Sequence, residues 1–200
     1  MTKVIRNLIK TITYVAVAAV FAGCATTVDS VNESAKIAQS AEVTDKKIVF
    51  GKFRLMQNGE EVTLGDSVFA NSATLQLYRY ETDREIVGKV GKDGDFAWVL
   101  EPGQYQLSSI AFKHRGESIE PDTSFAFTVS ADHDASYVGT ITLEATSDSG
   151  YHGTSVMVER FTVSNDCEAE CGKVLTALGM TQDAATTSLL HWETQVASNR

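Results

Sequence analysis

The feature that most constrains the fold is a repeating pattern of short apolar runs that begins after Lys47. Runs of five to nine residues, rich in β-branched and aromatic side chains, alternate with clusters of Gly, Asp and Asn. This regular spacing is typical of an all-β sandwich. We expect strands at residues 48–56, 74–81, 85–90, 95–100, 105–113, 124–129, 137–144 and 155–163.

The chemistry of the turns and the alternation within the strands support this pattern. Asn58-Gly59 and Asp93-Gly94 tolerate a positive φ, and Pro102-Gly103 sets one corner. In 105–113 the apolar alternation changes phase at Ser108-Ser109, which predicts a β-bulge. Alternation elsewhere predicts the core side chains Phe96, Trp98, Leu100, Phe125, Phe127, Val129, Ile141 and Leu143.

The last part of the chain predicts helices. Cys171, Val174, Leu175 and Leu178 recur at helical spacing, with Asn165 or Asp166 as the cap and Gly179 as the end. A second short helix is expected after Thr181, with Ala185, Leu189 and Trp192 on one side. The predicted fold class is mainly β: an antiparallel β-sandwich at 47–164, two short C-terminal helices at 165–194 and a tail at 195–200.

Three segments between residues 50 and 107 resemble a known family. They are Phe50-Gly51-Lys52-Phe53, Asp93-Gly94-Asp95-Phe96 and Pro102-Gly103-Gln104-Tyr105-Gln106-Leu107. They are similar to the Gly-x-Phe strand and the Pro-Gly-x-Tyr-x-Leu corner of carboxypeptidase-regulatory-like, transthyretin-like β-sandwich modules. Such modules act as rigid spacers, partner-binding domains or carbohydrate-contacting domains. The resemblance implies a transthyretin-like or Ig-like sandwich and transfers no catalytic or ligand residue.

The amino terminus predicts a secretory signal that ends at a cysteine. Residues 1–10 carry three basic residues and no acid, and residues 11–23 are mainly apolar and too short for a membrane-spanning helix, which is the alternative. Phe21-Ala22-Gly23-Cys24 resembles the lipobox of bacterial lipoproteins. The resemblance implies a signal peptide at 1–23, lipidation of Cys24 and, from Ala25, sorting to the outer membrane of a Gram-negative cell, facing the periplasm. Residues 24–46 are expected to form a flexible tether.

Charge and cysteine content limit the function further. The formal net charge of −9 becomes about −12 without the signal, which argues against nucleic acid as a partner. Cys167 and Cys171 remain as an even pair in an oxidising compartment, and we expect a disulfide, the alternative being two reduced thiols on the helix stripe.

Neither a metal site nor a catalytic site is predicted. Two sulfurs without a nearby histidine leave a zinc ion half-ligated, and Asp132-His133-Asp134 is interpreted as a solvated acidic turn. We find no nucleophile elbow and no phosphate-binding glycine loop. We therefore expect no enzyme activity and no cofactor.

The clearest indication of binding is a pair of tyrosines. Leu75 and Leu77 face one way from their strand, whereas Tyr78 and Tyr80 face the other. If these two rings are exposed, they would contact sugars or a partner protein. The alternative is that they pack beneath the terminal helices. The leading hypothesis is a membrane-anchored, non-enzymatic structural or partner-binding module with a protein partner in the cell envelope. The alternative is a carbohydrate-binding module.

Overall fold

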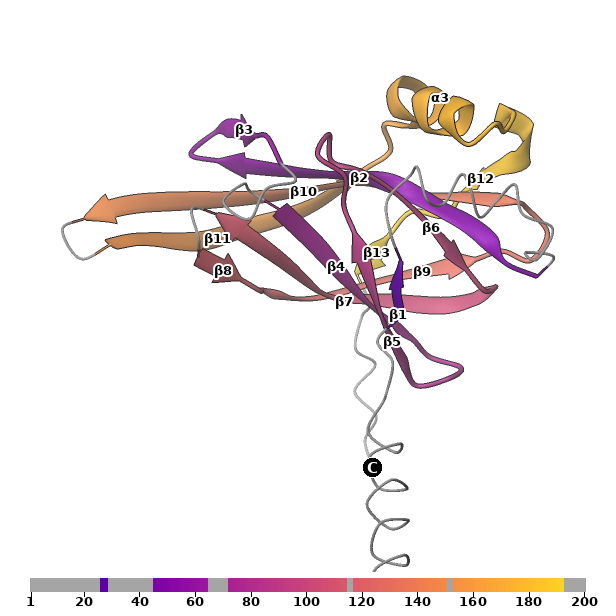
Figure 1. The fold of residues 1–200 in the computed structure, drawn as a ribbon, viewed down its shortest axis with the longest axis horizontal. Coiled ribbons are helices and arrows are strands. Elements are labelled where there is room, and N and C mark those ends of the chain that lie inside the picture. The colour runs from indigo at the N-terminus through magenta and orange to yellow at the C-terminus, as the bar shows by residue number, and fades with distance from the viewer. Residues whose placement is uncertain (1–25, 29–44, 65–71, 115–116, 151–152, 193–200) are drawn as a thin grey trace, which may run out of the picture.

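Two β-sheets stacked face to face make up most of the fold (Figure 1). The structure, a computed structural model, describes residues 26–28, 45–64, 72–114, 117–150 and 153–192. The larger sheet has seven strands in the order β1-β5-β4-β7-β9-β13, with β8 paired to β7. Its strands are β1 (Thr26–Val28), β4 (Ser72–Arg79), β5 (Arg84–Lys89), β7 (Gly103–His114), β8 (Glu117–Ile119), β9 (Asp122–Val129) and β13 (His191–Trp192).

The second sheet has six strands and mixed directions. Its order is β11-β10-β2-β3, with β12 paired to β10 and β6 paired to β2. The strands are β2 (Lys47–Gln57), β3 (Glu60–Val62), β6 (Asp95–Leu100), β10 (Ala135–Gly150), β11 (Gly153–Ser164) and β12 (Ala185–Thr187). Because β10 runs parallel to both β2 and β12, the expectation of an antiparallel sandwich is wrong for this sheet. Parallel pairing needs a long connection, and the chain between β2 and β10 supplies one.

The predicted strands and local irregularities are confirmed. All eight expected strands are present, and 95–100 has its predicted bounds. Gln76 pairs with Ser109 and Leu77 pairs with Leu107, so that Ser108 is the extra residue of the predicted bulge. Asn58 and Gly59 have φ values of 52° and 83° between the paired residues Gln57 and Glu60, which is the two-residue hairpin that the sequence favours.

The main core lies between the two sheets and contains every core residue predicted from alternation. Phe96 stacks on Trp98 with ring centroids 4.3 Å apart. The indole of Trp98 in turn lies directly on Gly88, where an added Cβ would come within 2.4 Å of the ring. The larger sheet therefore approaches Trp98 closely because Gly88 has no side chain.

A second apolar cluster lies outside the sandwich, beneath α3 (Cys167–Ala177). The helix covers part of the outer face of the six-stranded sheet, where Phe50 and Tyr137 are fully buried with ring centroids 5.5 Å apart (Figure 1). Asp166 is the cap residue, as predicted, although its side chain makes no capping hydrogen bond. Gly179, with φ of 70°, ends the helix as expected.

The second predicted helix is wrong. After a single 3₁₀ turn, η1 (Gln182–Ala184), the chain forms β12 parallel to β10 and then β13 antiparallel to β9. The edge of β10 offers backbone partners to the β-branched pair Thr186-Thr187, and this non-local pairing prevails over the helical spacing of the apolar residues. We call residues 185–192 the C-terminal strap, because they pass from one sheet to the other and bury Leu190 in the main core.

The predicted tether is partly wrong as well, because Thr26–Val28 pairs in parallel with Ile86–Gly88 as strand β1. The signal peptide, Cys24 and the 195–200 tail lie outside the described residues. Among the helices that the structure describes, none is long and apolar enough to cross a membrane.

Candidate functional site

The outer face of the seven-stranded sheet carries neutral polar side chains and two tyrosines. Leu75 and Leu77 point into the core, so the residues between and beyond them on β4 point outward. Tyr78 lies opposite Gln106 of β7, which lies opposite Ala126 of β9. We name this surface the tyrosine face and define it by Thr74, Gln76, Tyr78, Tyr80, Gln104, Gln106, Ser124, Ala126 and Thr128.

The two rings form a right-angled pair. Their centroids are 5.5 Å apart and their planes meet at 89°. The Tyr78 hydroxyl donates a hydrogen bond of 2.6 Å to Oδ1 of Asp83, and this bond raises the pKa of Tyr78 above its usual range. Tyr80 follows β4 in the connection to β5 and is 38% exposed. Tyr78 is thus held by its hydroxyl, while Tyr80 is accessible to solvent.

The helix does not cover these rings. α3 packs on β2 and β10 of the six-stranded sheet, whereas Tyr78 and Tyr80 belong to the outer face of the other sheet. The alternative in which both rings pack beneath the terminal helices is therefore wrong.

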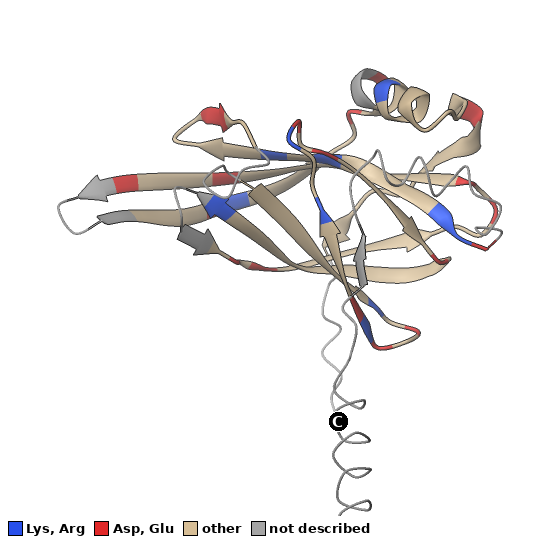
Figure 2. Cartoon of the chain, viewed as in Figure 1, with Lys and Arg blue, Asp and Glu red and all other residues tan. Residues whose placement is uncertain are grey.

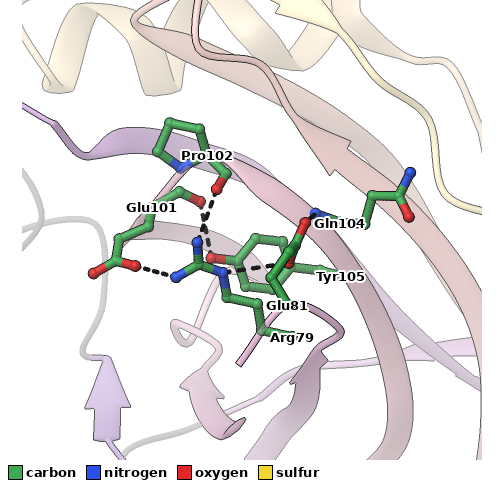
Figure 3. A network of polar contacts seen from close by, with 6 residues as sticks. All are labelled: Arg79, Glu81, Glu101, Pro102, Gln104 and Tyr105. Atoms are coloured by element: carbon green, nitrogen blue, oxygen red, sulfur yellow. Dashed lines mark hydrogen bonds and ion pairs between the residues drawn. The ribbon is translucent and has the colours of Figure 1, made fainter. Parts of the chain in front are cut away.

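A network of polar contacts lies behind Tyr80, at the corner where β6 leads into β7 (Figure 3). We call it the arginine clamp; its members are Arg79, Glu81, Glu101, Pro102, Gln104 and Tyr105. The Arg79 guanidinium pairs with the Glu101 carboxylate and donates a 3.0 Å hydrogen bond to the carbonyl of Pro102. Its Nε lies 3.4 Å from Oε2 of Glu81.

The clamp also ties the β4–β5 connection to the backbone of β7. The Gln104 amide donates to Oε1 of Glu81 at 2.7 Å, and this bond is the main reason that the pKa of Glu81 is lowered. Gly103 has φ of 151°, and a Cβ there would lie 2.9 Å from both carboxylate oxygens of Glu81. Both neighbours of Tyr80 in the chain are therefore fixed to the Pro102-Gly103 corner.

Tyr105 forms the floor of the clamp. Its ring is almost fully buried, and its hydroxyl donates a 2.8 Å hydrogen bond to the Glu101 carbonyl. Burial raises the pKa of Tyr105 to about 12, since the charged phenolate would lose its hydration there. The Arg79 guanidinium carbon lies 5.9 Å from the centroid of this ring. Sequence reasoning missed the clamp; the available signal was the Pro-Gly corner, which marked where it forms.

The outer face of the six-stranded sheet differs, because its charges pair with one another. Arg54 binds Glu61 through two hydrogen bonds of 3.1 and 2.7 Å, and Arg160 contacts both carboxylate oxygens of Glu144 at 2.7 Å. Figure 2 shows acidic segments on β3 and β10 beside basic segments on β2. These pairs and α3 account for much of this face among the described residues, while Met157 on β11 is 66% exposed.

The remaining predicted sites have simple outcomes. The Sγ atoms of Cys167 and Cys171 lie 2.02 Å apart at the start of α3, which is disulfide distance. Asp134 of the acidic turn forms an ion pair with Lys47 at 3.2 Å. Across the described ranges, no group of three or more His, Cys, Asp and Glu side chains is placed to hold a metal ion.

Comparison with known proteins adds little. No protein-family model matches the chain, and no curated protein matches it. A candidate cell adhesion protein from Bacteroides uniformis ATCC 8492 is 15% identical with a TM-score of 0.27, over 58% of this chain and 50% of that one. The dioxygenase domain of a dioxygenase and carbohydrate-binding protein fusion from Streptomyces sp. SirexAA-E is 7% identical with a TM-score of 0.23, over 44% and 61%. The chain thus spans half to about three fifths of these two neighbours, and neither similarity supports an argument about function.

Proposed function

We propose that this protein is a membrane-anchored, non-enzymatic binding module of the cell envelope, and that the tyrosine face is its binding surface. One observation carries the proposal: Tyr78 and Tyr80 lie on a sheet face that α3 leaves open, among amide and hydroxyl side chains. Aromatic side chains on an uncovered polar face are typical of recognition surfaces.

Carbohydrate is the ligand class that this surface fits best. A tyrosine ring packs against the apolar C–H face of a sugar, while a glutamine amide both donates to and accepts from sugar hydroxyls. Gln104 and Gln106 supply amides on the strand beside the two rings. Binding sites commonly combine an apolar surface with a few placed polar groups in this way.

The binding proposal is tested by retention of the full chain in native gels that contain polysaccharide. Wild-type protein is expected to be retarded, and Tyr80→Ala is expected to lose the retardation. Met157→Ala is the control, because Met157 is 66% exposed on β11 of the other sheet and its removal should change nothing. If no polysaccharide retards the protein and a photo-crosslinker at position 80 captures an envelope protein, the ligand of the tyrosine face is a protein and not a carbohydrate.

The anchor is a separate part of the proposal and rests on Cys24 with the basic and apolar residues before it. Two or three acyl chains on one residue suffice for stable attachment to a bilayer. In cells, Cys24→Ala should move the protein from the membrane to the soluble fraction, and mass spectrometry of the wild-type amino-terminal peptide should show an acylated cysteine. Continued sedimentation of Cys24→Ala with outer membranes would contradict lipid anchoring.

A further inference from the structure

The charge distribution around the tyrosine face restricts the carbohydrate it can accept. The row that joins Tyr78, Gln106 and Ala126 is uncharged on these three strands and continues to Glu85 on β5 and His191 on β13. The pair of Gln104 and Thr128 is also uncharged. The centre of the tyrosine face is therefore uncharged.

Acidic residues lie beside the rings. Asp83 accepts the hydrogen bond of the Tyr78 hydroxyl, and Glu85 lies opposite Tyr78 on β5. Glu120 binds the Gln76 amide at the other end of the face. These carboxylates would repel a carboxylate or sulfate group on a ligand.

Two basic residues of this sheet, Arg79 and Lys89, are placed away from the rings, while Arg84 is exposed beside Glu85 on β5. Arg79 follows Tyr78 in sequence, but its guanidinium is turned into the clamp and is engaged by Glu101 and the Pro102 carbonyl. Lys89 lies opposite Thr74, two alternate positions along β4 from Tyr78. An acidic ligand at the rings would therefore meet no cation from Arg79 or Lys89.

The tyrosine face also repeats along the strands. Tyr80 donates its backbone amide to the Gln104 carbonyl at 3.2 Å, and Tyr78 lies opposite Gln106, so each row combines one ring with one glutamine. Alternate residues on a strand are about 6.8 Å apart and neighbouring strands about 4.8 Å apart. A ligand that itself repeats, such as a polysaccharide chain, can satisfy both rows at once.

The rings are held in place before any ligand binds. The clamp fixes Arg79 and Glu81 on either side of Tyr80, and the bond to Asp83 fixes the Tyr78 hydroxyl. Side chains ordered in advance lose less entropy on binding. The geometry thus suits an extended neutral chain laid across a firm surface.

We infer that the tyrosine face binds a neutral polysaccharide chain and discriminates against acidic polysaccharides. This inference rests on the proposed function. The Tyr80 ring stacks on one sugar ring, the Tyr78 ring at right angles to it contacts the same chain through its edge, and Gln104 and Gln106 hydrogen-bond to sugar hydroxyls.

The test compares neutral and acidic polymers on the full chain in detergent. Cellohexaose, laminarin and mannan serve as neutral probes, and polygalacturonate serves as the acidic one. At least one neutral probe is expected to bind about tenfold or more tightly than polygalacturonate, and Tyr80→Ala is expected to weaken that binding about tenfold. Gln106→Leu should weaken it by a smaller factor, and Met157→Ala should leave it unchanged.

The outcomes separate this inference from the proposed function. If polygalacturonate binds as tightly as the neutral probes or more tightly, and Tyr80→Ala still abolishes this binding, the preference for neutral polysaccharides is contradicted. The tyrosine face would remain the binding surface. Binding of no probe would contradict this inference and carbohydrate as the ligand class, and binding that Tyr80→Ala leaves intact would contradict the tyrosine face as the binding surface. Thermal unfolding of each variant, at a midpoint within a few degrees of the wild type, confirms that a lost affinity does not come from a lost fold.

Discussion

The two outer faces of the sandwich are built from similar alternating strands and yet present opposite surfaces. On the six-stranded sheet, the outward residues Phe50 and Tyr137 are apolar and are covered by α3, and the outward charges of Arg54 and Arg160 are paired. On the seven-stranded sheet, the residues of the tyrosine face are uncharged, Glu85 and Lys89 flank them on β5, and Tyr80 is 38% exposed. The two faces thus differ in what covers them: among the described residues, α3 lies over part of the six-stranded sheet and leaves the tyrosine face open.

The largest expected effect contrasts an aromatic residue from each face. Phe50→Ala should lower the free energy of unfolding by about 3–5 kcal/mol, because Phe50 is fully buried beneath α3. Tyr80→Ala should lower it by about 0.5–1.5 kcal/mol, because its ring is 38% exposed and its main described contact is the ring of Tyr78. Urea unfolding of both variants measures the difference. Similar losses for the two variants would break the comparison, since Tyr80 would then be a structural residue.

The next effect concerns the floor of the clamp and appears at alkaline pH. With its pKa raised by burial from 10.0 to about 12, neutral Tyr105 contributes stability that is fully present below pH 10 and is lost as the pH rises toward 12. Wild-type stability should fall by about 2–3 kcal/mol relative to Tyr105→Phe across that window. Unfolding midpoints of the two proteins at a series of pH values provide the measurement. Parallel pH curves would mean that Tyr105 is not buried as the structure has it.

A smaller effect is expected at the corner that positions Tyr80. Gly103→Ala would place a methyl group against the Glu81 carboxylate and require a positive φ of alanine, which should cost about 1–3 kcal/mol. Gly59→Ala is the matched control, because Gly59 also has positive φ but has no neighbour within 4 Å of the added Cβ. A loss no larger at Gly103 than at Gly59 would show that the carboxylate does not pack there.

The smallest effect belongs to the paired charges of the six-stranded sheet. Arg160→Gln should lower the free energy of unfolding only slightly, and high salt should reduce the loss further, because the Arg160 side chain of this pair is 62% exposed. Unfolding at low and high ionic strength provides the comparison. A loss that salt does not change would indicate packing by the Arg160 side chain in place of ion pairing.

Local sequence patterns predicted the parts of the fold that local physics decides. Apolar alternation located the strands, and a change of phase located the bulge at Ser108. The even pair of Cys167 and Cys171 predicted their pairing, which lies at the start of α3. The same alternation predicted that Tyr78 and Tyr80 share one outward face. It could not predict whether another element of the chain would pack over them.

Non-local pairing explains what the sequence did not predict. Ala185, Leu189 and Trp192 have helical spacing, but β12 and β13 form because β10 and β9, far away in the sequence, offer open backbone edges. The same reason accounts for β1 in the predicted tether. The clamp joins Arg79 to Glu101 across 22 positions of sequence. Charged residues are common on protein surfaces, so no local sequence pattern predicts that these two will pair.

The most direct test of the central claim is amide and side-chain NMR mapping of the folded chain with neutral oligosaccharides of glucose and mannose. The tyrosine-face account predicts shifts centred on Tyr78, Tyr80, Gln104 and Gln106, with none at α3 or at the Arg54–Glu61 pair. Shifts centred on α3, or no shift at Tyr78 and Tyr80 with any of these sugars, would contradict it.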